Sequence, residues 1–254
     1  MLYYEGKITQ SEKLAQQNMC KFMKILLVKR LESSFYAFRN TLARFIKSYQ
    51  HFLQEFNNGN VYVSKEYTGK IFELLEDDDD EAIQRLIDED KARKYQAKDF
   101  TATFKEDLQS DLTVLKEIDG LWKGIHRDPK LLTFLDILSS RNILKDNKLI
   151  IFTESKETAE YLETHIRNKF PGEVLCFSGS SGAATRDKVI ANFDARAKPP
   201  KDDYRILITT EVLSEGVNLH RSNVVINYDI PWNPTRLMQR AGRINRVDTK
   251  FDII

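Results

Sequence analysis

The sequence has little or none of several features, and each absence excludes a class of protein. Its two cysteines, Cys20 and Cys176, are far apart and fit no metal-ligand spacing, so we expect free thiols, no disulfide and no metal site. No run of about 18 apolar residues could span a bilayer. The N-terminus also lacks the basic segment and apolar stretch of a signal peptide. We therefore expect a soluble, cytoplasmic protein with no membrane partner.

Two nucleotide-binding signatures are missing as well. The sequence contains neither a GxxxxGK[ST] phosphate-binding loop nor a GxGxxG segment after a strand. A self-sufficient nucleotide hydrolase or dehydrogenase is therefore not expected. The formal net charge is only +1, so bulk charge does not indicate a nucleic-acid partner, and any such surface must be a local patch.

Proline and glycine are distributed unevenly along the chain. All six prolines lie at or after Pro129, and neither proline nor glycine occurs between Lys70 and Asp119. The first part of the chain therefore has little to interrupt helices, whereas the second part is punctuated like an α/β domain. We predict a mostly helical attachment or insertion over residues 1–127 and an α/β domain over 128–254, truncated at its C-terminus.

Periodic apolar residues in the first part predict an antiparallel helical hairpin. A stripe with alternating steps of four and three indicates one long helix, which Asn57-Asn58-Gly59-Asn60 ends, and a second stretch has similar spacing. The first stripe is Leu31, Phe35, Phe38, Leu42, Phe45, Tyr49, Phe52 and Phe56, and the second is Phe104, Leu108, Leu112, Leu115, Ile118 and Trp122.

Charged residues in this part are interpreted as solvated surface. A set of basic residues beside the first stripe could follow a phosphate backbone, but a solvated helix face explains them as well and is preferred. The acidic run 76–81 is interpreted as an exposed loop or helix end. The basic residues are Lys29, Arg30, Arg39, Arg44 and Lys47.

From Asp128 onward the pattern changes to short strands separated by helices. Asp128-Pro129 is typical of a helix N-cap followed by proline at the first helical position. Short apolar strands then alternate with amphipathic helices, which predicts βαβ units and a parallel sheet with flanking helices. The expected strands are LIIFT, EVLCFS, RILITT and VVINYD, with helices near 156–168 and 184–193 and from about Pro234.

The segment QRAGRINR, residues 239–246, carries the clearest chemical signal. Arg243 and Arg246 are three residues apart and would project from one face of a helix, where two guanidinium groups can grip one polyanion. Arginine suits this role because its planar donor fork stays charged and matches phosphate oxygens. A pair of surface salt bridges is the alternative explanation.

A second segment, TTEVLSEGVNL at residues 209–219, follows an apolar strand directly. Loops at the carboxyl ends of parallel strands commonly bind ligands, and Gly216 would let the backbone approach a phosphate or ribose closely. An ordinary connection between strand and turn explains the segment equally well.

Three segments, in this order and spacing, resemble the C-terminal RecA-like lobe of superfamily-two helicases in the Swi/Snf-type branch, with a bacterial RapA-like relative as the nearest type. KLIIFTES (148–155) resembles motif IV, ILITTEVLSEGVNL (206–219) resembles motif V, and QRAGRINR resembles motif VI. VVINYDIPWNPTRLMQ resembles the linking segment of bacterial relatives. The resemblance covers about residues 128–254 and implies the C-terminal motor lobe of an ATP-dependent helicase or translocase. More loosely, KRLESSFYAFRNTL resembles a segment before this lobe in bacterial Swi/Snf-like proteins.

The resemblance implies that ATP and Mg²⁺ are bound chiefly by an N-terminal RecA-like lobe that this sequence lacks. Arg243 and Arg246 would be arginine fingers that reach the γ-phosphate, with Gln239 beside the site. Gly216 and Asn218, with Glu215, would touch the nucleotide side of the cleft.

The resemblance also implies contact with a nucleic-acid backbone, with double-stranded DNA as the expected form. Thr209, Thr210 and the turn at Ser178-Gly179 would make these sequence-independent contacts. The helical region could bind a protein partner. DNA and RNA are not distinguished by these motifs, nor is strand separation from translocation.

Two departures from the family pattern affect the choice of branch. Val247-Asp248-Thr249 stands where the remodelling branch usually has an Ile-Gly-Gln segment, which favours a bacterial helicase-like protein over a eukaryotic remodeller. Gln239 stands where DEAD-box RNA helicases usually have histidine, which disfavours that branch. Two other functions remain open: a protein-interaction module with an inert lobe, and the motor lobe of a restriction-type translocase.

Overall fold

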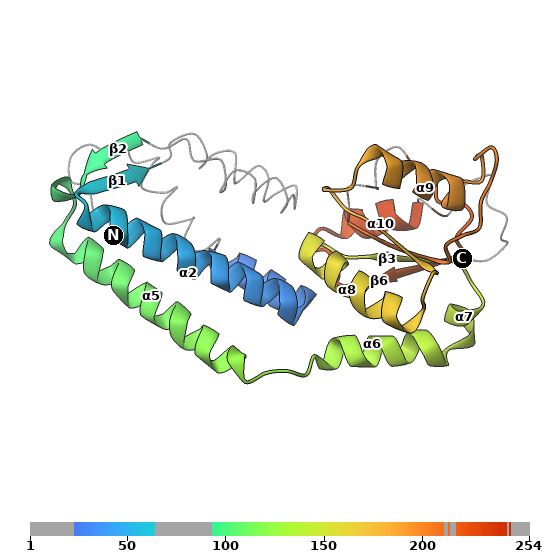
Figure 1. Cartoon of the computed structure of the whole chain (residues 1–254), viewed down its shortest axis with the longest axis horizontal. Coiled ribbons are helices and arrows are strands. Elements are labelled where there is room, and N and C mark those ends of the chain that lie inside the picture. The colour runs from blue at the N-terminus through green and yellow to red at the C-terminus, as the bar shows by residue number, and fades with distance from the viewer. Residues whose placement is uncertain (1–22, 64–92, 211–212, 214–216, 243, 245–254) are drawn as a thin grey trace. The chain divides into compact units, whose positions relative to one another are not determined.

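The computed structural model describes residues 23–63, 93–210, 213, 217–242 and 244 (Figure 1). The chain forms two compact units, Met1–Arg127 and Asp128–Ile254. The acidic run 76–81 and Cys20 lie outside the described residues.

The first unit contains the predicted antiparallel helical hairpin. Near one end of the pair, the rings of Phe38 and Trp122 lie with centroids 4.8 Å apart, and near the other end those of Phe52 and Phe104 are 5.9 Å apart. The helices therefore run in opposite directions side by side, as Figure 1 shows in blue and green. The elements are α2 (Phe35–Asn57), β1 (Asn60–Val63), β2 (Arg93–Gln96), a 3-10 turn (Ala97–Asp99) and α5 (Ala102–Lys123), with β1 and β2 antiparallel.

The first apolar stripe does not lie on one continuous helix, and that prediction is wrong at Ser34. Residues 23–33 are helical, but Ser34 has extended backbone angles (φ −160°, ψ 154°), and α2 begins after it. The Ser34 hydroxyl accepts a hydrogen bond of 3.0 Å from the Ala37 amide, which makes it the N-cap of a new helix. Leu31, before this break, is 37% exposed, whereas Phe38 within α2 is 6% exposed, so the buried part of the stripe lies in α2.

The basic residues beside the stripe are not all solvated. Arg39 and Lys47 are exposed, as expected of a solvated face. Arg30, by contrast, is only 5% exposed and lies in the buried part of the unit. For Arg30 the surface interpretation is therefore wrong.

The second unit is an α/β domain built on a four-stranded parallel sheet, as predicted. The strand order is β4-β5-β3-β6, and every pairing is parallel. The predicted N-cap is present, because the Asp128 carboxylate accepts a hydrogen bond of 3.1 Å from the Leu131 amide. The elements are α6 (Pro129–Ser140), α7 (Asn142–Lys145), β3 (Leu149–Phe152), α8 (Lys156–Lys169), β4 (Val174–Phe177), α9 (Ala183–Phe193), β5 (Ile206–Thr209), β6 (Val224–Asn227) and α10 (Pro234–Gly242).

The sheet is buried on both faces because alternate residues of each strand enter different cores. In β3, Leu149 and Ile151 pack with residues of α6 and α8, whereas Ile150 and Phe152 pack with residues of α9. All four side chains are 0% exposed. This two-sided burial explains why the strand sequences are continuous apolar runs rather than alternating ones.

Polar side chains form hydrogen bonds and ion pairs at the amino ends of the strands. Arg205, just before β5, donates hydrogen bonds of 2.6 Å to the Glu173 carboxylate before β4 and to the Leu144 carbonyl. Lys148, just before β3, forms an ion pair with Asp202. This amino edge therefore has its own charged network.

The described part of the chain offers neither a membrane-spanning helix nor a metal-binding group. None of the helices there has the length and apolar character needed to cross a membrane. Among the same residues, no group of three or more histidine, cysteine, aspartate or glutamate side chains could hold a metal ion.

Candidate functional site

The carboxyl ends of the four strands lie in line at one edge of the sheet. The last residues pair in register: Phe177 of β4 with Thr209 of β5, Thr209 with Phe152 of β3, and Phe152 with Asn227 of β6. The segments that follow these strands therefore begin side by side, although they are far apart in sequence. We call this line the carboxyl edge, and it brings together the segments resembling motifs IV and V with the turn at Ser178.

The carboxylate of Asp229 connects the segment after β6 to the segment after β3. One of its oxygens accepts a hydrogen bond of 2.7 Å from the Thr153 hydroxyl, and the other accepts one of 2.7 Å from the Glu154 amide. Thr153 and Asp229 are both buried, at 0% and 8% exposed. Two hydrogen bonds to a buried carboxylate fix the start of the Thr153-Glu154-Ser155 loop.

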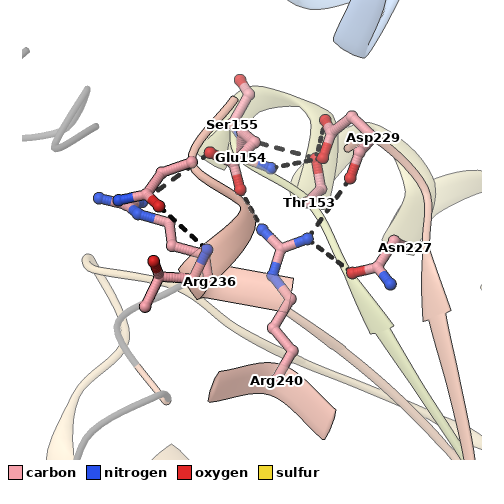
Figure 2. Close-up of polar contacts among 9 residues, drawn as sticks. Thr153, Glu154, Ser155, Asn227, Asp229, Arg236 and Arg240 are labelled. Carbon is pink, nitrogen blue, oxygen red and sulfur yellow. Dashed lines mark hydrogen bonds and ion pairs between the residues drawn. The ribbon is translucent and has the colours of Figure 1, made fainter. Parts of the chain in front are cut away.

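The next residue in this network is Arg240, in the segment that resembles motif VI. Its guanidinium donates a hydrogen bond of 2.7 Å to the Asn227 side chain and one of 3.4 Å to the Asp229 carbonyl, and it forms an ion pair with Glu154 (Figure 2). The same group lies over the Phe152 ring, 5.2 Å from its centroid. Arg240 is 0% exposed.

Glu154 receives a second arginine from the same helix. Arg236 lies one turn before Arg240, and its guanidinium is 3.8 Å from the other carboxylate oxygen of Glu154 (Figure 2). The side chains of Arg236 and Glu154 are only 15% and 14% exposed, so water screens this pair weakly. One carboxylate after β3 therefore binds two successive turns of α10.

The structure places the four predicted nucleic-acid-binding residues at the carboxyl edge. Thr209 and Thr210 are buried, and the Thr209 hydroxyl donates a 3.0 Å hydrogen bond to the Thr210 carbonyl. The Ser178 hydroxyl is also buried and lies 3.2 Å from that of Ser180, whereas Gly179 is exposed. Their contact with nucleic acid stays a prediction.

Two of the predicted nucleotide-side residues are described. Gln239 is exposed on α10, directly before the buried Arg240. Asn218 is half-buried between Val217 and Leu219, which are buried in the core beneath α9. The remaining predicted residues, Arg243, Arg246, Gly216 and Glu215, lie outside the described residues.

Sequence reasoning assigned no role to Glu154, Asp229 or Arg240. Each lies inside a segment that the motif comparison already identified, and each carboxylate comes directly after an apolar strand. A charged residue at the carboxyl end of a buried strand must find a partner, because an unpaired charge there is costly. That signal predicts a network, although it does not identify Arg240 as the partner.

The comparison with known families agrees with this geometry. Residues 129–248 match the family described as "Helicase conserved C-terminal domain". The second unit is a helicase C-terminal domain. The fold and the family resemblance predicted from the three motifs are thus confirmed for this unit, and the matched range includes the whole network around Arg240.

Curated relatives of the helicase domain come from bacteria and eukaryotes. The ATP-dependent helicase YqhH of Bacillus subtilis is 38% identical over 108 residues, which are 42% of this chain and 18% of YqhH. The ATP-dependent RNA helicase uap56 of Schizosaccharomyces pombe is 36% identical over 117 residues, 45% of this chain and 24% of uap56. The RNA polymerase-associated protein RapA of Photobacterium profundum is 29% identical over 126 residues, 50% of this chain and 12% of RapA.

These relatives are much longer than the matched region. The chain spans about a fifth of YqhH, about a quarter of uap56 and about an eighth of RapA. Among solved structures, the C-terminal part of the Fun30 ATPase domain is 20% identical to this chain, with a TM-score of 0.42, and the match covers 60% of this chain and 53% of that one.

Proposed function

We propose that this chain contributes the C-terminal motor lobe of an ATP-dependent nucleic-acid helicase or translocase. In this proposal, Arg243 and Arg246 act as arginine fingers toward ATP that is held mainly by an N-terminal RecA-like lobe of the same polypeptide. The observation that carries the proposal is the attachment of α10 to the carboxyl edge through Arg240. That attachment joins the segment resembling motif VI to the segments resembling motifs IV and V.

The chemical part of the proposal follows from charge. When bound, ATP with Mg²⁺ supplies the γ-phosphoryl group that is transferred to water. Negative charge spreads over the phosphoryl oxygens in the transition state, and a fixed guanidinium stabilises that charge without reorganisation. Arg243 and Arg246 would supply the charge, and Gln239, which is exposed next to the buried Arg240, would be available to the same ligand.

The described residues at the carboxyl edge do not make a complete nucleotide site. They fit one side of a cleft whose other side would be formed by the N-terminal lobe. Asn218 and Gln239 offer amide groups, which can hydrogen-bond a nucleotide. The sequence has no phosphate-binding loop, so most phosphate contacts would come from the N-terminal lobe.

The proposal includes a sequence-independent grip on a nucleic-acid backbone. Exposed Gly179 and the buried hydroxyl of Ser178 lie at the start of the loop before α9, where backbone amides can reach phosphate oxygens. Double-stranded DNA is the proposed substrate. Among the relatives, uap56 is named as an RNA helicase, so RNA is the alternative that a binding assay with both nucleic acids would test.

The deciding experiment is alanine substitution of each arginine in the polypeptide that carries both lobes. Arg243→Ala and Arg246→Ala should each lower kcat for ATP hydrolysis by a factor on the order of 10³, with a smaller change in KM. Lysine at either position should restore little activity, because its ammonium group cannot reproduce the bidentate fork. Steady-state ATPase assays with saturating DNA or RNA, with thermal melts alongside, provide the measurement.

Arg167→Ala is the matched control. Arg167 is exposed on α8 and forms an ion pair with Glu163 one turn earlier, so its loss should cost about 1 kcal/mol or less and leave kcat unchanged. Near-normal turnover in both Arg243→Ala and Arg246→Ala would reject the arginine-finger assignment.

A further inference from the structure

The helix that leads to the two proposed fingers is attached to its domain in an unusual way. Of the nine residues of α10, as far as the structure describes them, only Arg240 is buried. A surface helix normally packs on the sheet through an apolar stripe. In α10 a fully buried guanidinium takes that place, and Met238 on the same helix is 75% exposed.

The contacts of Arg240 fix α10 against two strands at once. Asn227 is the last residue of β6 and Asp229 follows that strand, whereas Glu154 follows β3. Hydrogen bonds to charged groups are directional, so contacts with three acceptors restrict both the rotation of the helix about its axis and its sliding along the edge. An apolar contact would restrict these movements less, because dispersion contacts have no preferred direction.

A second anchor follows directly after the helix. Ile244 is 0% exposed and packs in the core beneath α9 with Phe152 and Leu219. Its amide donates a hydrogen bond of 3.1 Å to the Ala241 carbonyl. In the sequence, Arg243 comes three residues after the buried Arg240 and one residue before the buried Ile244.

We infer that Arg240 is a positioning residue that sets the register of α10, the helix directly before Arg243 in the sequence, through its ion pair with Glu154. The inference rests on the function proposed above. It assigns to Glu154, in the loop after β3, the role of fixing the register of α10, so that the segments resembling motifs IV and VI act as one unit. Arg240 is not a catalytic residue, because its guanidinium is buried against protein groups.

Catalysis by charge depends steeply on position, and a displacement of about 1 Å can lower a rate by a factor on the order of 10². Arg240→Lys keeps the positive charge but cannot hold several acceptors in the plane of a guanidinium. Glu154→Gln keeps the shape and a hydrogen-bond acceptor and removes only the negative charge. Both variants should therefore loosen the helix register with little change in side-chain volume.

The test is a double-mutant cycle in the polypeptide that carries both lobes. Arg240→Lys and Glu154→Gln are each made in the native protein and in the Arg243→Ala background, and kcat, KM for ATP and thermal stability are measured for all. We expect each variant to lower kcat on the order of 10² in the native background, with KM nearly unchanged. In the Arg243→Ala background the same substitutions should lower the residual kcat by less than about threefold, because residues that act as a unit are not additive.

Arg205→Lys is the control, since Arg205 forms a comparable arginine–carboxylate pair with Glu173 at the opposite, amino edge of the sheet. It should lower the melting temperature without any background-dependent change in kcat. An equal fractional loss of kcat for the Arg240 and Glu154 variants in both backgrounds, or a normal kcat in both folded variants, would overturn the inference. If Arg240→Lys does not fold, Glu154→Gln alone decides. Normal turnover in Arg243→Ala itself would instead reject the proposed function.

Discussion

Burial, together with the nearby carboxylates of Glu163 and Glu160, raises the pKa of the Cys176 thiol, in strand β4, from 9.0 to about 12. The thiolate is the reactive form, so the folded protein should hold this cysteine almost entirely as the unreactive thiol at pH 8. In a Cys20→Ser variant, iodoacetamide should alkylate Cys176 at least about 10²-fold more slowly in the folded protein than in guanidinium chloride.

The same shift has a consequence for stability. Between pH 9.0 and about 12 the unfolded thiol loses its proton while the folded thiol keeps it, so the free energy of unfolding contributed by Cys176 falls as pH rises through this window. A Cys176→Ala variant should show a smaller alkaline loss of stability. Equal alkylation rates in the folded and unfolded protein would contradict the assignment of Cys176 as a half-buried, protonated thiol.

Single residues were the hardest feature to predict. The sequence indicates that Arg243 and Arg246 could bind a polyanion, because a spacing of three residues would place them on one face of a helix. The role of Arg240 depends on Glu154, which is 86 residues away, and no local pattern connects them. Their proximity follows from the strand order, since β3 and β6 are neighbours in the sheet but not in the sequence.

At the scale of elements, periodicity predicted the type of almost every helix and strand named in advance. The strands of the parallel sheet were predicted correctly because a run of about four apolar residues between polar residues is typical of a buried strand. Missed features were the break at Ser34, the short strand β2 and the short helix α7. The regular sequence spacing of apolar residues on both sides hides such a break, although serine before an apolar stretch is a known N-cap signal.

The N-cap at Ser34 leads to a prediction about the first unit. Ser34→Ala removes the acceptor for the Ala37 amide and should lower the free energy of unfolding by about 1 kcal/mol. Ser48→Ala is the matched control, because Ser48 is exposed in the interior of α2 and alanine there should be neutral or slightly stabilising. Urea unfolding followed by circular dichroism would measure both. Equal stability of the two variants would mean that the Ser34 cap contributes nothing.

At the scale of the whole molecule, the proposal assigns ATP binding to the N-terminal lobe and the arginine fingers to this chain, which leads to a prediction about ATP hydrolysis. The isolated chain should not turn over ATP, because the phosphate-binding loop and the Mg²⁺-holding acid are expected in the N-terminal lobe. Purified chain and its Arg243→Ala variant should show the same background hydrolysis. A rate in the native chain that exceeds the variant's would contradict this division.

The two edges of the parallel sheet carry separate polar networks, and each strand between them is only four residues long. At about 3.3 Å per residue, the edges lie roughly 13 Å apart. Lys148, Glu173 and Arg205 hold one edge, and Glu154, Asp229 and Arg240 hold the other. Loops at the amino edge can therefore change in length, charge or thermal tolerance without changing the geometry of the carboxyl edge. The apolar layer of the four strands separates the two.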